Sequence, residues 1–138
     1  MVEFEYSPLH PPSDSSEGFI SMPSNEFYKM ARELEKLGPS ALFRGSKNRM
    51  DIYSDDEGIV FELENDYTRE TDQTEVQVEA DFEDVRLSTD YLLLFARSKK
   101  LSKRIVIKFY SQGLASFEYW ESEWGRSRIT YFLAPMVD

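Results

Sequence analysis

Two groups of cationic side chains lie in a chain that is strongly acidic as a whole. The formal net charge is −10 over 138 residues. Lys29, Arg32 and Lys36 recur at helical spacing in an early segment, on one face of the helix expected there. The second group lies in and just after a later helical segment: Arg97, Lys99, Lys100, Lys103 and Arg104. Cations gathered on matching elements bind phosphate groups, so this pattern indicates a polyanion-binding surface.

The ordinary alternative is that these cations only solvate a helix face. Their repetition on a second helical segment disfavours it, as does the segregation of charge along the chain. From Asp51 to Asp84 there are fourteen acidic residues, and the only cation is Arg69. Phosphate contacts would give affinity without base preference. No aromatic residue interleaves with the cations in the sequence pattern, which disfavours a reader of single-stranded nucleic acid.

Residues suited to catalysis or metal binding are scarce. The chain has no cysteine, and its one histidine, His10, lies among prolines. It also lacks a Gly-rich phosphate loop, a nucleophile elbow and metal-ligand spacing. Asp55-Asp56-Glu57 could hold a divalent cation, but a solvated hairpin turn is the more ordinary interpretation. We therefore predict a protein that is not an enzyme and has no metal site and no cofactor.

The bulk composition predicts one globular domain. The chain is 41% apolar, 14% aromatic and 30% charged, and its length can bury a sizeable core. Its apolar runs are short, such as residues 92–96, so no membrane span or membrane partner is expected. The absence of cysteine suits a reducing compartment, and we expect an intracellular protein.

The elements that would position the cations follow from the periodicity. In the first half we expect a strand at residues 18–22 and a helix capped by Ser24 and stopped by Gly38-Pro39. Phe27, Met30, Ala31, Leu34 and Leu37 form its apolar stripe. The period then changes to two, which predicts strands at residues 41–44, 49–53, 57–64 and 75–82.

The second half has the same organisation. After the strand at residues 75–82, a helix is expected from Ser88 or Thr89, followed by strands at residues 104–110, 114–120 and 126–133. The order strand, helix, three strands thus occurs twice, which indicates an internal duplication. We predict an α+β fold of two such units, with two helices packed on one face of an antiparallel sheet.

Three segments resemble a known family. They are MPSNEF at residues 22–27, running on to Gly38; YLLLFAR at residues 91–97, followed by Leu101-Ser102; and YFLAP at residues 131–135. In this order and spacing they resemble the C-terminal domain of the eukaryotic and archaeal sliding clamp, proliferating cell nuclear antigen. The resemblance covers about residues 18–137. It implies a DNA-clamp fold within a ring that encircles double-stranded DNA, with helices lining the hole.

The resemblance assigns the DNA-facing residues position by position. Lys29, Arg32 and Arg97 match cationic inner-face positions of the family, whereas Asp90 stands where related clamps often carry a basic residue. Helix geometry and local charge add three further cations to the predicted DNA-binding set: Lys36, Lys99 and Lys100.

The resemblance also implies a pocket for the short peptide motif of DNA polymerases, ligases and nucleases. It would be formed by the following residues: Leu114, Phe132, Leu133, Ala134 and Pro135. Phe132 stands where the family usually has tyrosine, which keeps an apolar wall and loses a hydroxyl.

The resemblance places a subunit-pairing edge on one strand: Ile59, Val60, Phe61, Glu62, Leu63 and Glu64. A normal subunit of this family has two clamp domains, and the resemblance extends only to the second of them. We expect residues 1–17 to be a strand and linker resembling part of an interdomain connector, and residues 18–138 to be the clamp domain. Single domains could assemble into a homo-oligomeric ring, six replacing three double ones. Alternatively the chain is a truncated clamp paralogue or fragment that binds and regulates a full-length clamp. The location would be the nucleus in a eukaryote or the cytoplasm in an archaeon.

Overall fold

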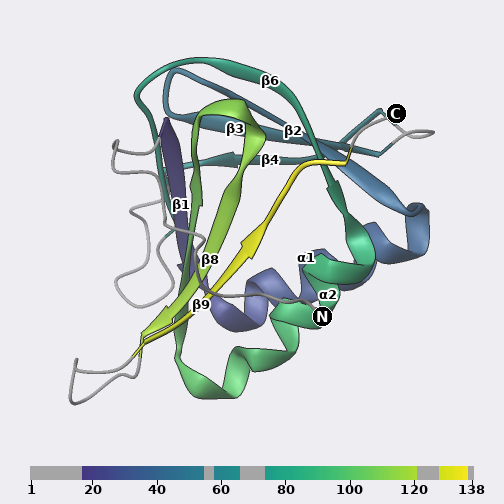
Figure 1. Cartoon of the computed structure of the whole chain (residues 1–138), viewed down its shortest axis with the longest axis vertical. Helices are drawn as coiled ribbons and strands as arrows, with labels where there is room; N and C mark the ends of the chain where they lie inside the picture. The colour runs from purple at the N-terminus through teal and green to yellow at the C-terminus, as the bar shows by residue number, and fades with distance from the viewer. Residues whose placement is uncertain (1–16, 55–57, 66–73, 121–127, 137–138) are drawn as a thin grey trace.

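A computed structural model describes residues 17–54, 58–65, 74–120 and 128–136 (Figure 1). The predictions for residues 1–16 and for Asp55-Asp56-Glu57 lie outside these residues, as does the start of the strand predicted at residues 126–133. The elements follow in this order: β1 (Gly18–Pro23), α1 (Ser24–Leu37), β2 (Ser40–Ser46), β3 (Arg49–Ser54), β4 (Gly58–Glu64), β5 (Glu75–Val78), β6 (Phe82–Ser88), α2 (Thr89–Ala96), the 3-10 turn η1 (Arg97–Leu101), β7 (Arg104–Phe109), the 3-10 turn η2 (Ser111–Gly113), β8 (Ala115–Trp120) and β9 (Arg128–Leu133).

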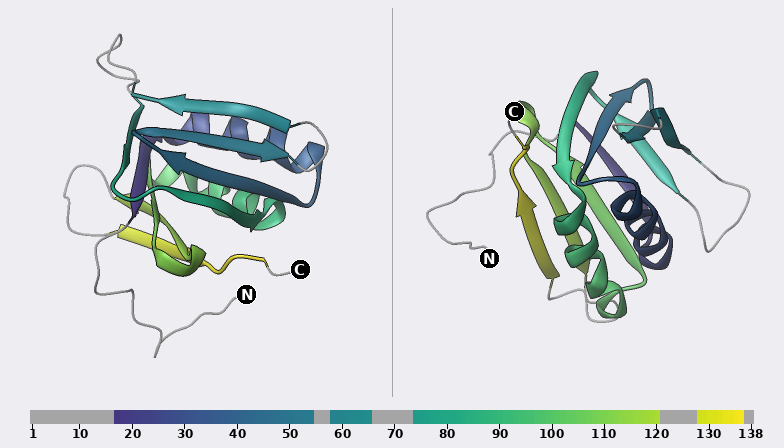
Figure 2. Two further views of the ribbon diagram at one scale, coloured as in Figure 1. Left: turned by 90° about the horizontal axis from the view of Figure 1, so that it is seen from above. Right: turned by 90° about the vertical axis from the view of Figure 1, so that its right-hand side faces the viewer.

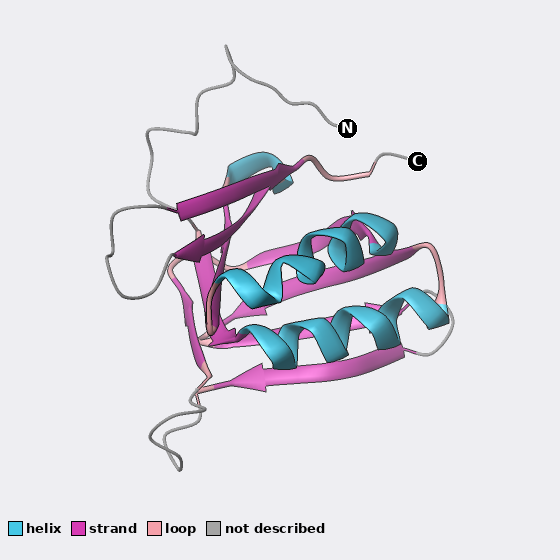
Figure 3. Ribbon diagram, turned by 90° about the horizontal axis from the view of Figure 1, so that it is seen from below, coloured by secondary structure: helices cyan, strands magenta, loops and turns pink. Residues whose placement is uncertain are grey.

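The strands form two antiparallel sheets, and both helices lie on the same side of them (Figures 2 and 3). One sheet has the order β5-β1-β7-β8-β9 and the other β4-β3-β2-β6. The predicted α+β clamp fold is confirmed. The sequence suggested one sheet, but the strands form two. Strands twist relative to one another, so a single sheet of this many strands could not present one face that packs on both short helices.

The two repeats exchange their first strands. The first repeat is β1-α1-β2-β3-β4 and the second is β6-α2-β7-β8-β9. However, β1 pairs with β7 of the second repeat, and β6 pairs with β2 of the first. Each sheet therefore contains strands from both repeats, and the remaining strand, β5, pairs with the free side of β1.

The single strand predicted at residues 75–82 is wrong. The chain leaves the five-stranded sheet after Val78 and enters the four-stranded sheet at Phe82. The bend is held by the carbonyl of Glu17, which accepts from the backbone N–H groups of Glu79 (2.7 Å) and Ala80 (3.2 Å). A continuous alternation of side chains in the sequence gives no sign of such a change of sheet.

Both helices begin within one residue of the predicted positions, and α1 also ends where Gly38-Pro39 predicted, but the contacts at their first residues differ. α1 buries Phe27, Met30, Ala31 and Leu34, as its period predicts. Its predicted cap is wrong, because the Ser24 hydroxyl bonds outside the helix and caps nothing. In α2, by contrast, the Ser88 hydroxyl accepts a hydrogen bond from the Tyr91 N–H at 3.4 Å.

An aromatic cluster joins the helices to the five-stranded sheet. The ring of Phe117 in β8 lies 6.0 Å from Phe27 of α1 and 5.3 Å from Phe95 of α2, measured between centroids. Phe95 also stacks on Tyr131 of β9 at 4.6 Å. This core fixes the two helices side by side, and their outer faces are left to solvent. Among the described residues, no helix has both the length and the apolarity needed to cross a bilayer.

Candidate functional site

The cations of α1 are exposed on the side of the helix away from the core. Lys29 and Lys36 form one-turn ion pairs, at 3.6 Å from Nζ to Glu26 Oε2 and at 3.8 Å from Nζ to Glu33 Oε2. Exposed pairs of this kind contribute about 0–1 kcal/mol, so a phosphate group can replace either carboxylate at little cost. The third cation, Arg32, is also exposed.

Part of the second cationic group belongs to η1, where the sequence had indicated the end of the second helix, and Lys103 and Arg104 follow η1 along the chain. α2 ends at Ala96, and Arg97, Lys99 and Lys100 lie in the tighter 3-10 turn that follows. Arg97 and Lys100 are exposed, whereas Lys99 is half-buried. η1 lies beside the start of α1, because residues of both line one groove.

One aromatic ring does lie among these cations, contrary to the sequence pattern. Lys99 Nζ lies 3.9 Å from the centroid of Tyr28 in α1, and Arg32 Cζ lies 5.8 Å from the same centroid. Cation–π attraction therefore links a residue of η1 to a residue of α1 through Tyr28. Because Tyr28 and Lys99 are far apart in the sequence, no local spacing could have revealed this contact.

A groove of about 740 Å³ runs between the first turn of α1 and η1. Its lining has five cationic side chains and one acidic side chain, Glu26. The cations are Lys29, Lys99, Lys100, Lys103 and Arg104. Ser24 links the two sides of the groove, because its hydroxyl donates to the carbonyls of Ser102 (2.6 Å) and Lys99 (3.2 Å).

The groove thus joins part of the predicted DNA-binding set. It brings Lys29, Lys99 and Lys100 together, and Tyr28 connects Arg32 to them. Lys36 and Arg97 do not line the groove, and they remain predicted contacts on the same exposed helix side. Lys103 and Arg104 line the groove but were not in the predicted DNA-binding set, although the sequence had placed both in the second cationic group.

The C-terminal segment passes from β9 along η2 to β6. Leu133 pairs with Ala115, the residue after Leu114. A side-chain carbon at Gly113, where φ is +83°, would lie 3.0 Å from Pro135 Cγ. Beyond it, the Met136 N–H donates to the Arg86 carbonyl at 2.8 Å. The structure therefore brings the predicted pocket residues into one region, and their binding of a peptide stays a prediction.

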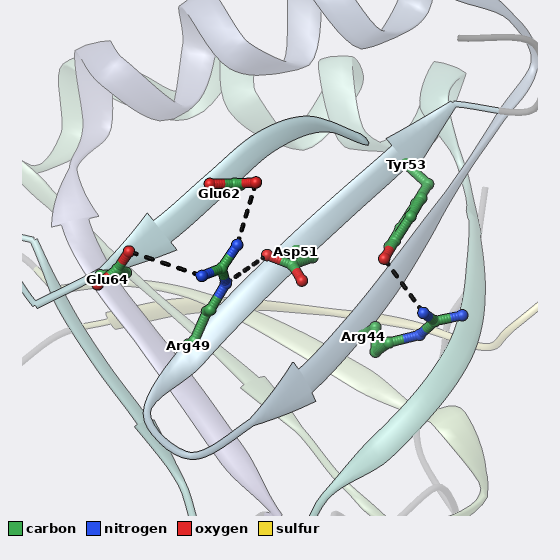
Figure 4. A network of polar contacts seen from close by, with 6 residues as sticks. All are labelled: Arg44, Arg49, Asp51, Tyr53, Glu62 and Glu64. Carbon is green, nitrogen blue, oxygen red and sulfur yellow. Dashed lines mark hydrogen bonds and ion pairs between the residues drawn. The ribbon is translucent and has the colours of Figure 1, made fainter. Parts of the chain in front are cut away.

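The predicted subunit-pairing strand, β4, is an edge strand of its sheet. Arg49 of β3 crosses to it on the face away from the helices (Figure 4). Its guanidinium donates from Nε to Asp51 Oδ1 at 2.9 Å and pairs through Nη2 with Glu62 Oε2 at 3.0 Å and through Nη1 with Glu64 Oε2 at 3.9 Å. The hydrogen bond to Asp51, followed by the charges of Asp51 and Glu62, raises the pKa of Arg49. One positive charge thus faces three carboxylates, so Arg49 only partly offsets the negative charge of Glu62 and Glu64 beside the edge.

A comparison with known protein families agrees with this architecture. Residues 12–136 match the family described as "Proliferating cell nuclear antigen, C-terminal domain", which covers nearly the whole chain. Members of that clamp family are non-enzymatic scaffolds of DNA replication and repair that act as processivity factors. With two repeated units, two helices on one side and sheets on the other, this chain belongs to the proliferating cell nuclear antigen C-terminal domain family.

Proposed function

We propose that this chain is a sliding-clamp component that holds duplex DNA against the exposed side of α1 and η1. The observation that carries the proposal is the groove in which cations from the two repeats meet. A protein of net charge −10 would repel DNA elsewhere on its surface, so this side offers the favourable approach.

The chemistry of these contacts suits sliding. Each ion pair with a phosphate would be exposed and weak, and Glu26 and Glu33 compete for the same lysines. Contacts to phosphate carry no base information, so the protein can move along the duplex by exchanging them, with water between many of the partners. Processivity would then come from encirclement and not from tight binding.

We further propose that the segment from Phe132 to Pro135, with Leu114, receives the peptide motif of polymerases, ligases or nucleases. Its support is the convergence of β9, η2 and β6 at this point, where partly exposed apolar side chains follow the end of a strand. A peptide carrying such a motif should bind the protein and should lose affinity when Leu133 is changed to aspartate.

Charge reversal tests the DNA-binding face. The triple variant Lys29→Glu, Arg32→Glu, Arg97→Glu should lose association with a fluorescent duplex at low salt, measured by anisotropy. Lys29→Glu alone should weaken binding several-fold. Lys47→Glu, in the turn between β2 and β3, makes the same change in net charge outside the groove and should have little effect. Undiminished binding by the triple variant would refute the proposal.

A second candidate function is regulation of a full-length clamp of the family by docking through β4. It is favoured by the position of β4 at the edge of its sheet. If this is the function, the chain should co-elute with a full-length clamp at low salt. Absence of co-elution over a range of concentrations would eliminate it.

A further inference from the structure

Three lysines that line the groove have no carboxylate partner within the described part of the chain. They are Lys99 and Lys100 of η1, and Lys103, which follows η1. The fourth lysine of the groove, Lys29, pairs with Glu26 at 3.6 Å. Like charges gathered in one recess repel one another, so the groove favours an anion that is supplied by a ligand.

The backbone beside these lysines does not oppose an anion. Carbonyl oxygens would repel it, but the N–H of Ser24 donates to the Lys103 carbonyl at 2.8 Å. The Ser24 hydroxyl engages the carbonyls of Ser102 and Lys99. The Ser102 hydroxyl accepts from the N–H of Arg104 at 3.3 Å, which leaves its own hydrogen for donation to a ligand. On the opposite wall, the positive end of the α1 dipole adds to the attraction.

The size and charge of the groove fit a short chain of phosphates. Its volume of about 740 Å³ lies within the range of small-molecule sites, roughly 300–1,000 Å³. Five cations and one carboxylate, that of Glu26, give its lining a net charge of +4. A triphosphate carries about four negative charges at neutral pH, one for each phosphate and about one more at the terminal phosphate. The described lining contains no aromatic side chain on which a base could stack, so the phosphates would be the recognised part.

We propose that the groove binds a free oligophosphate of about three phosphates, and that this ligand competes with duplex DNA. The chain of phosphates could belong to a nucleoside triphosphate or to an inorganic polyphosphate. The competition rests on the proposed function, because Lys29, Lys99 and Lys100 belong to both the groove and the predicted DNA-binding set. Lys103 lines the groove without belonging to that set, so it separates the two ligands experimentally.

Isothermal titration calorimetry of the full chain with sodium tripolyphosphate, at constant ionic strength and without divalent cations, tests the site directly. We expect binding at one site per chain, and Lys103→Gln should weaken it several-fold. Lys47→Gln is the matched control, because it makes the same change in net charge in the turn between β2 and β3. Orthophosphate should bind much more weakly, since it reaches fewer of the cations. Absence of tripolyphosphate binding, equal affinity for orthophosphate, or equal losses from the two variants would overturn the proposal.

Parallel titrations with deoxyadenosine triphosphate and deoxyadenosine distinguish the two sources of the phosphate chain. Tighter binding of the nucleotide than of tripolyphosphate would identify a nucleotide as the ligand. Equal affinities would assign recognition to the phosphate chain alone. Deoxyadenosine should not bind, and its binding with similar affinity would contradict recognition through phosphate.

Displacement of a fluorescent duplex, followed by anisotropy at fixed ionic strength, separates this inference from the proposed function. Tripolyphosphate should displace the duplex, and a several-fold higher concentration should be needed with Lys103→Gln. Simultaneous binding of both ligands would refute the competition. Duplex binding without tripolyphosphate binding would overturn only this inference. Tripolyphosphate binding without duplex binding would overturn the proposed function and leave the oligophosphate site.

Discussion

A single aromatic residue, Tyr28, orders cations from both repeats. It lies on α1 between the core stripe and the exposed cations, and it is half-buried. Lys99 and Arg32 are both within cation–π distance of its ring. Long side chains lose conformational freedom when they bind a phosphate, so a ring that holds them in place reduces this loss.

We expect Tyr28→Leu to weaken duplex binding and Tyr28→Phe to preserve it. Each cation–π contact at an exposed site is worth about 0.5–1 kcal/mol, so the leucine variant should lose about two- to fivefold in affinity. Anisotropy titrations at one salt concentration would measure the difference. Equal affinities for the two variants would show that the ring has no part in ordering the cations.

Gly45 in β2 packs directly against the ring of Phe82, with no room for a side chain. A side-chain carbon there would lie 2.6 Å from the Phe82 ring, which is itself stacked on Phe109 at 5.1 Å and cannot easily move. Gly45→Ala should therefore reduce the free energy of unfolding by about 1–3 kcal/mol through overpacking. Gly38→Ala is the control, because a carbon at Gly38 meets no atom within 4 Å. Denaturant midpoints would separate the two, and equal midpoints would contradict the prediction.

At the scale of elements, the coupling of α1 to η1 depends on Ser24. This first residue of α1 is buried, its N–H donates to the Lys103 carbonyl at 2.8 Å, and its hydroxyl reaches two further carbonyls of the η1 region. The groove exists because these bonds hold a helix of the first repeat against a turn of the second.

Ser24→Ala should weaken both stability and DNA binding. Loss of the hydroxyl leaves carbonyls without a donor and should cost about 1–3 kcal/mol. Ser88→Ala is the matched control: it removes the cap of α2, at a cost of about 1 kcal/mol, but leaves the groove intact. Thermal unfolding and anisotropy of both variants would test this. If Ser88→Ala lost as much DNA affinity as Ser24→Ala, the effect would be one of global stability.

The periodicity of the sequence predicted those helices and strands whose bounds depend on residues close to one another in the sequence. The apolar stripe of α1 follows from local spacing alone, and most strands were placed within a few residues. The split between β5 and β6 depends on contacts with Glu17, which is distant in the sequence. The candidate site also depends on contacts between distant residues. The two cationic groups could be recognised in the sequence, but the pairing of β1 with β7 is what brings them to one groove.

At the scale of the whole molecule, the separation of charge should govern how the protein meets DNA. Phosphate contacts release counterions, so affinity should fall linearly on a log–log plot against salt concentration. Each phosphate-contacting cation that is removed should reduce the steepness by about 0.9. Lys29→Glu should show this change in slope and Lys47→Glu should not. Identical slopes for both would show that Lys29 does not contact phosphate.

The exchange of first strands between the repeats has a consequence for how the chain acquires its structure. Ser24 and Ser102, which are joined by a hydrogen bond, are 78 residues apart, and β1 finds β7 only after most of the chain has been synthesised. Folding must therefore close long loops, which is slow. The first repeat alone lacks the strand β7 that pairs with β1, and it leaves β2 with only one of its two neighbours, β3. A gene encoding one repeat would need to yield two copies of its product before either could fold.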